Sequence, residues 1–213
     1  MSELILSSAY LPPVEYFGLI LNFENVIIED SESYQKQSFR NRTQILSANG
    51  LLPLSIPICQ HKSDILIKDI RIDYKTSWQR NHWRSIQSAY NNSPYFLYYQ
   101  DFLIPFFQKK STFLFDFNFE ITLLFMNLLK IDKQIRFTGN FIASYGDAFD
   151  CRNTIHPKKS SLPDYRFKLK QPYYQVFETK LDFIPNLSIL DLLFNEGANA
   201  CSILQNFCNF AIL

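Results

Sequence analysis

The stretch LILSSAYLPPVEYFGLILNFENVIIE, residues 4–29, decides the fold of this chain. Its first apolar run, Leu4–Ser8, predicts a short strand, and Pro12-Pro13 then opens a helix that continues to Leu21. Apolar side chains recur along this helix at three- and four-residue spacing, which predicts that one face is buried. A second apolar run, Val26–Glu29, predicts another strand. The stretch is therefore a strand–turn–helix unit followed by a strand, typical of folds that mix helices with a sheet.

A hairpin is predicted over residues 43–58, because Asn49-Gly50 lies between two extended segments and is the preferred dipeptide of a type I′ turn. A two-residue loop at this position would place Ile45 opposite Leu54. The second arm contains two prolines, which cannot donate hydrogen bonds to a neighbouring strand. We therefore expect the second arm to lie at the edge of a sheet.

The remaining pattern is mostly helical. Helices are predicted at 77–90, 95–107, 115–129, 189–195 and 198–210, and further strands at 65–74, 135–142 and 173–177. Pro105 is expected to break the second of these helices near its end. Ser188 is expected to cap the helix at 189–195, and Gly197 to stop it. The helix at 115–129 is apolar nearly all round, which predicts a buried central helix. The expected fold class is α/β (mixed α+β): a mixed sheet from the N-terminal strands and the hairpin, packed against a mostly helical C-terminal half in one domain, 1–213.

Composition excludes several classes of protein. The chain has 213 residues, of which 47% are hydrophobic, enough for one domain that needs no disulfide or metal to hold its core. Its 21 Lys and Arg residues balance 20 Asp and Glu residues, so the formal charge of +1 lacks the excess of a general nucleic-acid binder. We therefore expect no nucleic-acid partner.

The chain also lacks membrane and metal signals. Its longest uncharged apolar stretch in the middle, Ile121–Leu129, is far shorter than the ~18 residues of a transmembrane helix. The N-terminus has no basic region of the signal-peptide kind, so we expect a cytoplasmic protein. Four cysteines without zinc-ligand spacing are expected to be free thiols, and we predict neither a metal site nor a cofactor.

The best candidate for ligand binding is YQKQSFRNR, residues 34–42. Continuing the hairpin strand backwards would place Lys36, Arg40 and Arg42 on one strand face. Two guanidinium groups on one face could form a bidentate clamp for phosphate or carboxylate. The alternative is a solvated strand face.

Three further candidates are weaker. His82, on a predicted helix, could be a general base, although a single helical histidine is more often structural. Tyr10 follows the first strand at the end where open α/β sheets place ligands, or it packs on the rim of the sheet. His156, Lys158 and Lys159 lie in the long loop 143–171, which could act as a lid that holds an anion or could be a solvated basic loop.

Several blocks, read together, resemble the WbqC-like family. They are SAYLPPVEYF (8–17), the segment 34–42, Asn49-Gly50, WQRNHWR (78–84), SPYF (93–96) and FIPNLSILDLLFNEG (183–197). The resemblance spans nearly the whole chain. It implies a bacterial protein of surface-polysaccharide (O-antigen) biosynthesis, and a transferase that moves an acyl or aminoacyl group to a nucleotide-linked amino sugar.

Two hypotheses of function remain open from the sequence. In the first, an enzyme binds a nucleotide sugar or another anionic small molecule, and His82 takes the proton from an attacking amine. Its ligand-binding residues would be Tyr10, Lys36, Arg40, Asn41, Arg42, His156, Lys158 and Lys159. In the second, a non-catalytic binding or scaffold module docks a partner through the aromatic residues of 95–99.

Overall fold

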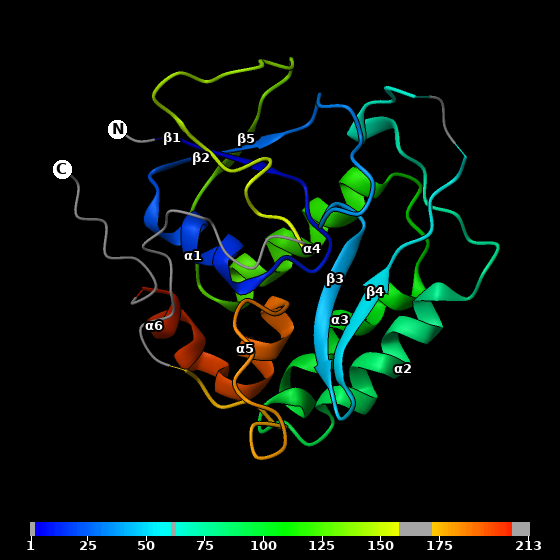
Figure 1. Ribbon diagram of the computed structural model, residues 1–213, viewed down its shortest axis with the longest axis vertical. Helices are drawn as coiled ribbons and strands as arrows, with labels where there is room; N and C mark the ends of the chain where they lie inside the picture. The colour runs from blue at the N-terminus through cyan, green and yellow to red at the C-terminus, as the bar shows by residue number, and fades with distance from the viewer. Residues whose placement is uncertain (1–2, 61–62, 158–171, 206–213) are drawn as a thin grey trace.

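The computed structural model describes residues 3–60, 63–157 and 172–205 (Figure 1). Its strands form a four-stranded parallel sheet, in the order β5-β2-β1-β6, and a separate antiparallel pair, β3-β4. Most of the helices follow the hairpin in the chain. The α/β mixed fold class is therefore confirmed, with the strands divided between two sheets.

The parallel sheet grows from the predicted unit at the N-terminus. β1 (Glu3–Ser7) and β2 (Asn25–Glu29) pair in parallel, with Leu4 opposite Val26, and α1 (Val14–Asn22) connects them. The three apolar residues in the middle of β1 are fully buried, as expected for a strand covered on both faces. The strand–helix–strand prediction is thus confirmed.

Two short strands complete this sheet. β5 (Ile135–Phe137) pairs with β2, and β6 (Phe149–Asp150) pairs with the other edge of β1. The chain therefore adds strands first on one side of β1 and then on the other. The carboxyl ends of β1 and β6 flank the point where the strand order reverses, which is where open α/β sheets commonly bind ligands.

The hairpin has a different turn from the one predicted. β3 (Arg42–Ser47) and β4 (Gly50–Ser55) pair with Ile45 opposite Leu52, two residues away from the predicted partner. Gly50 has a φ of 104°, whereas Asn49 does not have a positive φ. A type I′ turn needs positive φ at both central residues, so that turn type is excluded. The shift by two residues keeps the same side chains on the buried face.

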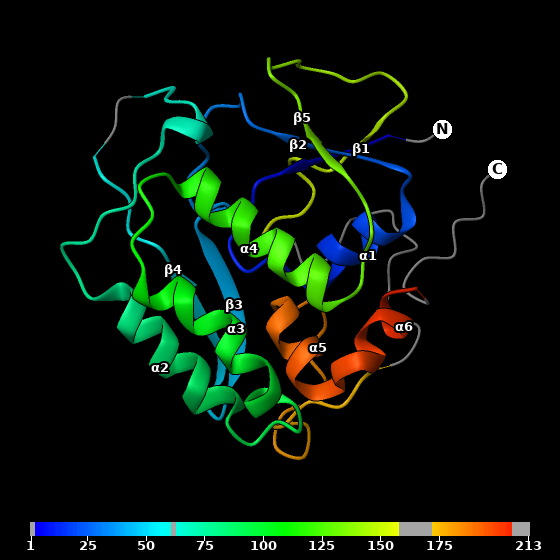
Figure 2. The same ribbon diagram turned by 180° about the vertical axis from the view of Figure 1, so that it is seen from behind.

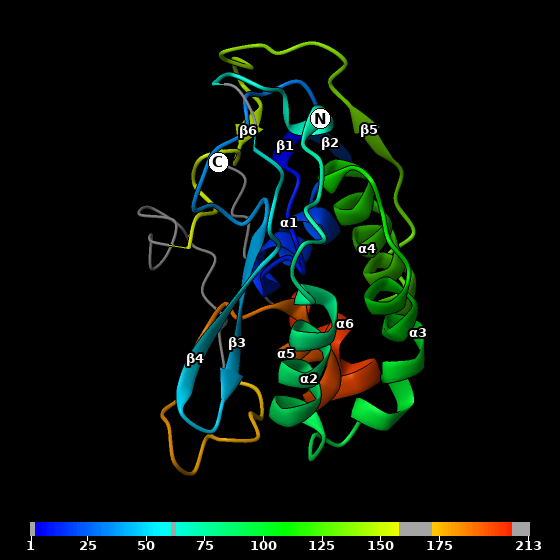
Figure 3. The same cartoon turned by 90° about the vertical axis from the view of Figure 1, so that its right-hand side faces the viewer.

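The remaining helices all follow the hairpin in the chain. They are α2 (Trp78–Tyr90), α3 (Phe96–Gln108), α4 (Leu114–Leu128), α5 (Ile189–Glu196) and α6 (Ala200–Gln205), with 3₁₀ turns η1 (Ile67–Asp69) and η2 (Gly197–Asn199). α2 packs against both β3 and α3, and Figure 3 shows it between the hairpin and α3. In the reverse view of Figure 2, α2, α3 and α4 lie on the side facing the viewer.

Three predicted elements differ from the structure. Residues 65–74 contain η1 and isolated bridges in place of a strand, and residues 173–177 form no strand. Pro105 lies inside α3 and does not break it. The carbonyl that loses a donor at this proline belongs to exposed Asp101, which water can reach. The predicted helix 198–210 begins as η2 and α6, and its end lies outside the described residues.

α4 is less buried than its sequence predicts. Asp116, Glu120, Leu123 and Asn127 are all exposed and follow one another at four- or three-residue spacing along one face of the helix. The opposite face, which includes Phe125, is buried. The prediction of a buried helix therefore holds for most of its circumference, and a single stripe, in which Leu123 is the one apolar residue, faces solvent.

Among the described residues, no helix is both long enough and apolar enough to cross a membrane.

We predict that Phe125→Ala destabilises the protein by about 3–5 kcal/mol, through lost transfer free energy and the cavity left behind. Phe125 is 0% exposed, and its ring centroid lies 5.9 Å from that of Phe17. Denaturant titration measures this cost. Leu123→Ala, on the exposed face of the same helix, is the matched control and should change the free energy of unfolding by about 0.5 kcal/mol or less. Equal effects of the two substitutions would contradict this packing.

Candidate functional site

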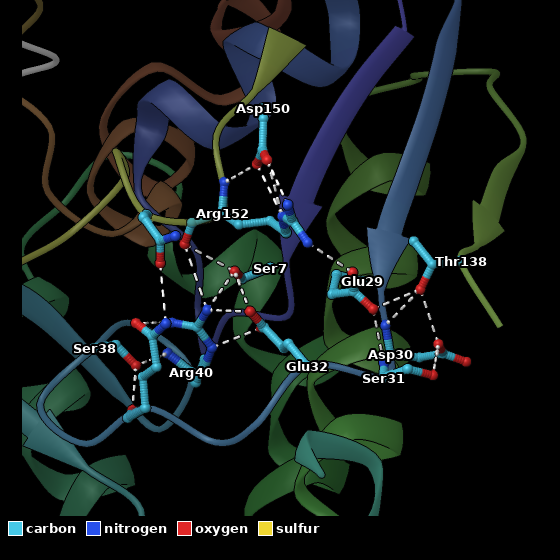
Figure 4. Close-up of polar contacts among 12 residues, drawn as sticks. Ser7, Glu29, Asp30, Ser31, Glu32, Ser38, Arg40, Thr138, Asp150 and Arg152 are labelled. Atoms are coloured by element: carbon cyan, nitrogen blue, oxygen red, sulfur yellow. Dashed lines mark hydrogen bonds and ion pairs between the residues drawn. The ribbon is translucent and has the colours of Figure 1, made fainter. Parts of the chain in front are cut away.

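Polar residues gather at the carboxyl edge of the parallel sheet (Figure 4). Ser7, Glu29 and Asp150 are the last residues of β1, β2 and β6, and Thr138 follows β5 directly. Parallel strands bring their carboxyl ends to one edge, so four segments distant in sequence meet there. Two arginines, contributed by loops, bind this edge.

Arg152 is the first of these arginines. Its guanidinium forms ion pairs with Glu29 at 2.9 Å and with Asp150 at 2.6 Å, and it donates hydrogen bonds to the carbonyl oxygens of Ile142 and Ala143. It also lies 4.8 Å from the ring centroid of Tyr145. Arg152 therefore holds the loop after β5 against the sheet edge.

Arg40 is the second, and its side chain is 3% exposed. Its Nη2 lies 2.5 Å from Glu32 and donates to Ser7 Oγ at 2.7 Å, while its Nε donates to the other Glu32 oxygen at 2.7 Å. Ser7 Oγ in turn donates to the carbonyl oxygen of Arg152 at 3.0 Å. The two arginines and their carboxylates thus form one buried network.

This network leaves little space for a ligand at the reversal point of the sheet. The cavity there, lined by Ser7, Tyr16, Arg40 and Cys151 among others, has about 10 Å³ open to the centre of a water molecule, room for about one water. Burial also raises the pKa of the Cys151 thiol to about 12, so the thiol stays protonated at neutral pH.

The predicted clamp of Arg40 and Arg42 is wrong. Residues 36–41 form turns, with Gln37 at a φ of 58°, and the strand begins only at Arg42. Arg40 turns inward because the buried carboxylate of Glu32 requires a cation. Arg42 remains at the surface, where its Nε donates to Ser55 Oγ at 3.2 Å.

A groove on the outer side of these turns brings three predicted residues together. Its volume is about 510 Å³, within the range of small-molecule sites. Lys36, Asn41 and Arg42 line it, together with Tyr34, Gln37, Ser55, Ile58, Cys59 and Gln60. Among these lining residues, all in the described part of the chain, Lys36 and Arg42 are cationic and none is acidic. The charge of the groove therefore favours an anionic ligand.

Tyr10 and His82 lie behind the groove. The Tyr10 hydroxyl is 3.0 Å from His82 Nδ1, and the imidazole also forms a hydrogen bond with the backbone of Ser55, a residue of the groove wall. Tyr10 is fully buried, so the structure corrects its predicted ligand contact to packing beside the sheet. His82 is 6% exposed and contacts Trp78 at 5.2 Å between ring centroids.

Burial lowers the pKa of His82 to about 4, because desolvation disfavours the imidazolium. The imidazole ring is therefore neutral at physiological pH, and it forms its hydrogen bonds with Tyr10 and the Ser55 backbone behind the groove wall. A catalytic role for His82 stays a prediction, and this geometry favours a structural one.

Of the predicted loop residues, only His156 lies in the part of the chain that the structure describes. His156 is half-buried and is not among the residues that line the groove. Lys158 and Lys159 lie outside the described residues. No group of three or more His, Cys, Asp or Glu side chains in the described ranges is arranged to hold a metal ion.

Sequence reasoning missed the partners of the buried arginines. Glu29 and Glu32 belong to the run EDSE, residues 29–32, which begins at the last residue of the second strand. Four acidic or hydroxyl residues at the carboxyl end of a buried strand are a signal that this edge carries charge. The partner cation, Arg152, is more than a hundred residues away and gives no local signal.

Glu15, in the first turn of α1, is another buried carboxyl. Its backbone N–H donates to Asn186 Oδ1 at 3.0 Å. Desolvation raises the pKa of Glu15 to about 7, and a side-chain hydrogen bond from Asn186 opposes this shift. A pKa raised on folding means that the native state binds the proton more tightly than the unfolded chain.

We predict that Arg40→Ala lowers the free energy of unfolding by about 3–5 kcal/mol, because it leaves the carboxylate of Glu32 buried without its cation. Arg42→Ala removes an exposed guanidinium two residues away and should cost about 1 kcal/mol or less. Chemical denaturation of both variants measures the difference. Equal, small costs would show that the Arg40 pair does not hold the fold.

We also predict a pH-dependent effect of Glu15→Gln. The stabilising contribution of protonated Glu15 is complete below the ordinary pKa of about 4.5 and is lost as the pH rises through 7. The variant should therefore gain stability relative to the wild type by up to about 3 kcal/mol between pH 4.5 and 8. Denaturant titrations across this range measure the difference, and a constant difference would contradict the raised pKa.

Comparison with known proteins places these features in a family. A profile of the WbqC-like protein family matches residues 7–151, which is more than half of the chain and includes both the groove and Arg40. The uncharacterized protein Rv1507c of Mycobacterium tuberculosis (strain ATCC 25618 / H37Rv) is 26% identical over 223 residues, covering 94% of this chain and 96% of that protein. No solved structure matches the chain. The chain belongs to the WbqC-like protein family.

Proposed function

We propose that the groove binds a nucleotide-linked sugar. The observation that carries this proposal is the placement of Lys36 and Arg42 in one groove of about 510 Å³ whose described lining contains no acidic residue. Two cationic side chains in one groove suit a diphosphate, and a guanidinium can bind two phosphate oxygens at once. The volume is that of a site for a small molecule rather than a single ion.

The neutral lining residues fit the rest of such a ligand. Asn41, Gln37 and Gln60 carry amide groups, which can both donate to and accept from sugar hydroxyls or a base. Asn41 already donates from Nδ2 to the carbonyl oxygen of Ile56 at 2.9 Å, so its side chain is held in place. Because this amide is already held in place, its side chain loses less conformational entropy when a ligand binds.

The reaction that we propose is acyl or aminoacyl transfer to an amino sugar, in line with the resemblance to the WbqC-like family. The sugar amine attacks the acyl carbonyl carbon, a carbon–nitrogen bond forms, the bond to the leaving group breaks, and the amine loses a proton. The contribution of the chain to this step is to bind and orient the nucleotide sugar. His82 lies behind the wall, so we place the departing proton on solvent or the leaving group.

A second function is favoured by the surface of α3. Leu97 and Tyr98 are each 69% exposed, and Tyr95 and Phe102 are also exposed on or beside this helix. Aromatic residues are enriched where protein interfaces gain most of their affinity. A binding or scaffold role in polysaccharide assembly would use this surface and leave the groove without a nucleotide sugar.

We predict that nucleotide sugars raise the melting temperature of the wild-type protein. A thermal-shift assay with uridine and thymidine diphosphate sugars measures this change. A ligand at 100 times its Kd contributes about 2.7 kcal/mol to stability. For a sugar that binds, Lys36→Ala with Arg42→Ala should weaken affinity at least about tenfold by calorimetry, because two charge-assisted contacts are lost. Binding should also weaken with added salt.

The matched control is Arg136→Ala, which removes an exposed arginine paired with Glu3 on the parallel sheet. It should leave affinity unchanged. A panel that produces no stabilisation would contradict the proposal and favour the scaffold role. Binding that survives the double substitution would place the ligand elsewhere on the protein.

A further inference from the structure

A second cavity lies between the end of α3 and the middle of α4. Its volume is about 290 Å³, at the lower end of the range for small-molecule sites. Pro105, Phe106 and Phe117 supply its apolar lining, and Lys109, Lys110 and Glu120 supply its charges. None of these residues lines the groove described above.

The apolar lining is fixed by the surrounding core. Phe117 is buried, and its ring centroid lies 6.0 Å from that of Phe106 and 5.9 Å from that of Trp78, both in edge-on contacts. Gln79 Nε2 donates to the carbonyl oxygens of Phe106 at 3.0 Å and Lys109 at 2.6 Å, which ties α2 to the end of α3. The cavity is therefore formed before any ligand binds.

The charged residues are exposed and available to a ligand. Lys109, Lys110 and Glu120 take part in no ion pair within the described ranges. The Lys110 ammonium lies 5.1 Å from the ring centroid of Tyr74, which holds it near the cavity. Glu120 follows Phe117 by three residues on α4, so both lie on one side of the helix. Charges of both signs thus border a wall of aromatic rings.

We propose that this cavity binds an amino acid with an aromatic side chain. The α-carboxylate contacts the ammonium groups of Lys109 and Lys110, and the α-ammonium contacts the carboxylate of Glu120. The aromatic side chain packs against Phe106 and Phe117, where edge-on and offset contacts between rings are favourable. A zwitterion with an apolar side chain matches all three parts of the lining, whereas a simple anion would leave Glu120 opposed to its charge. This proposal does not depend on the proposed function of the groove.

The test uses three ligands that differ by one charged group. L-Phenylalanine has both groups, 3-phenylpropanoate lacks the ammonium group, and phenethylamine lacks the carboxylate. We expect phenylalanine to bind most tightly in NMR titrations of the full chain, with each of the other two weaker by about five- to tenfold. Similar affinities for the three ligands, or no binding of phenylalanine at millimolar concentration, would overturn the proposal.

Variants then assign each contact. Glu120→Gln should weaken phenylalanine binding about five- to tenfold without weakening 3-phenylpropanoate binding, whereas Lys109→Ala with Lys110→Ala should weaken both. Asp116→Asn, an exposed carboxylate one turn earlier on α4, is the matched control and should have no effect. Lys36→Ala, in the groove, should also leave phenylalanine binding unchanged, which separates this test from that of the nucleotide sugar. If the Glu120→Gln variant still prefers phenylalanine to 3-phenylpropanoate as strongly as the wild type does, the assigned contact between Glu120 and the α-ammonium group is refuted.

Discussion

The buried ion pair between Arg40 and Glu32 determines how the segment after β2 crosses the sheet edge. A guanidinium at this depth is stable only if its donors meet acceptors, and Glu32 and Ser7 provide them. Arg152 meets the same requirement through its ion pairs with Glu29 and Asp150. The turns at 36–41 bury Ser38 and Phe39 together with Arg40 and leave Lys36 and Gln37 exposed, where both line the groove beside the hairpin.

This arrangement changes where a ligand can bind. In many open parallel sheets the carboxyl edge receives the ligand, and here the protein's own guanidinium groups occupy that edge. The remaining space holds about one water. We propose that ligands bind instead in two cavities outside the sheet, one beside the hairpin with cations and amides, and one between α3 and α4 with an aromatic wall. In this proposal the buried network supports the groove without forming part of it.

Local signals predicted much of this fold, and long-range contacts explain most of the errors. Ser188 caps α5 by accepting from the N–H of Leu190, and Gly197 ends that helix at a φ of 55°, both as expected from residue type. The hairpin position followed from Asn49-Gly50, but its turn type depended on the φ of Asn49. The inward turn of Arg40 depends on Ser7 and Glu32, which no spacing rule within 34–42 could reveal.

Local signals also predicted part of the candidate site. Lys36 and Arg42 were predicted as neighbours from their spacing, and the groove brings them together with Asn41, although on turns and a strand end rather than along one strand face. The most direct measurement is an amide NMR footprint of a bound nucleoside diphosphate sugar on the isotope-labelled protein. We expect the shifts to concentrate in residues 34–42 and 55–60 and to spare Ser7, Glu29 and Asp150. Shifts centred on those three strand ends would instead place the ligand at the sheet edge and contradict a structural role for the buried arginines.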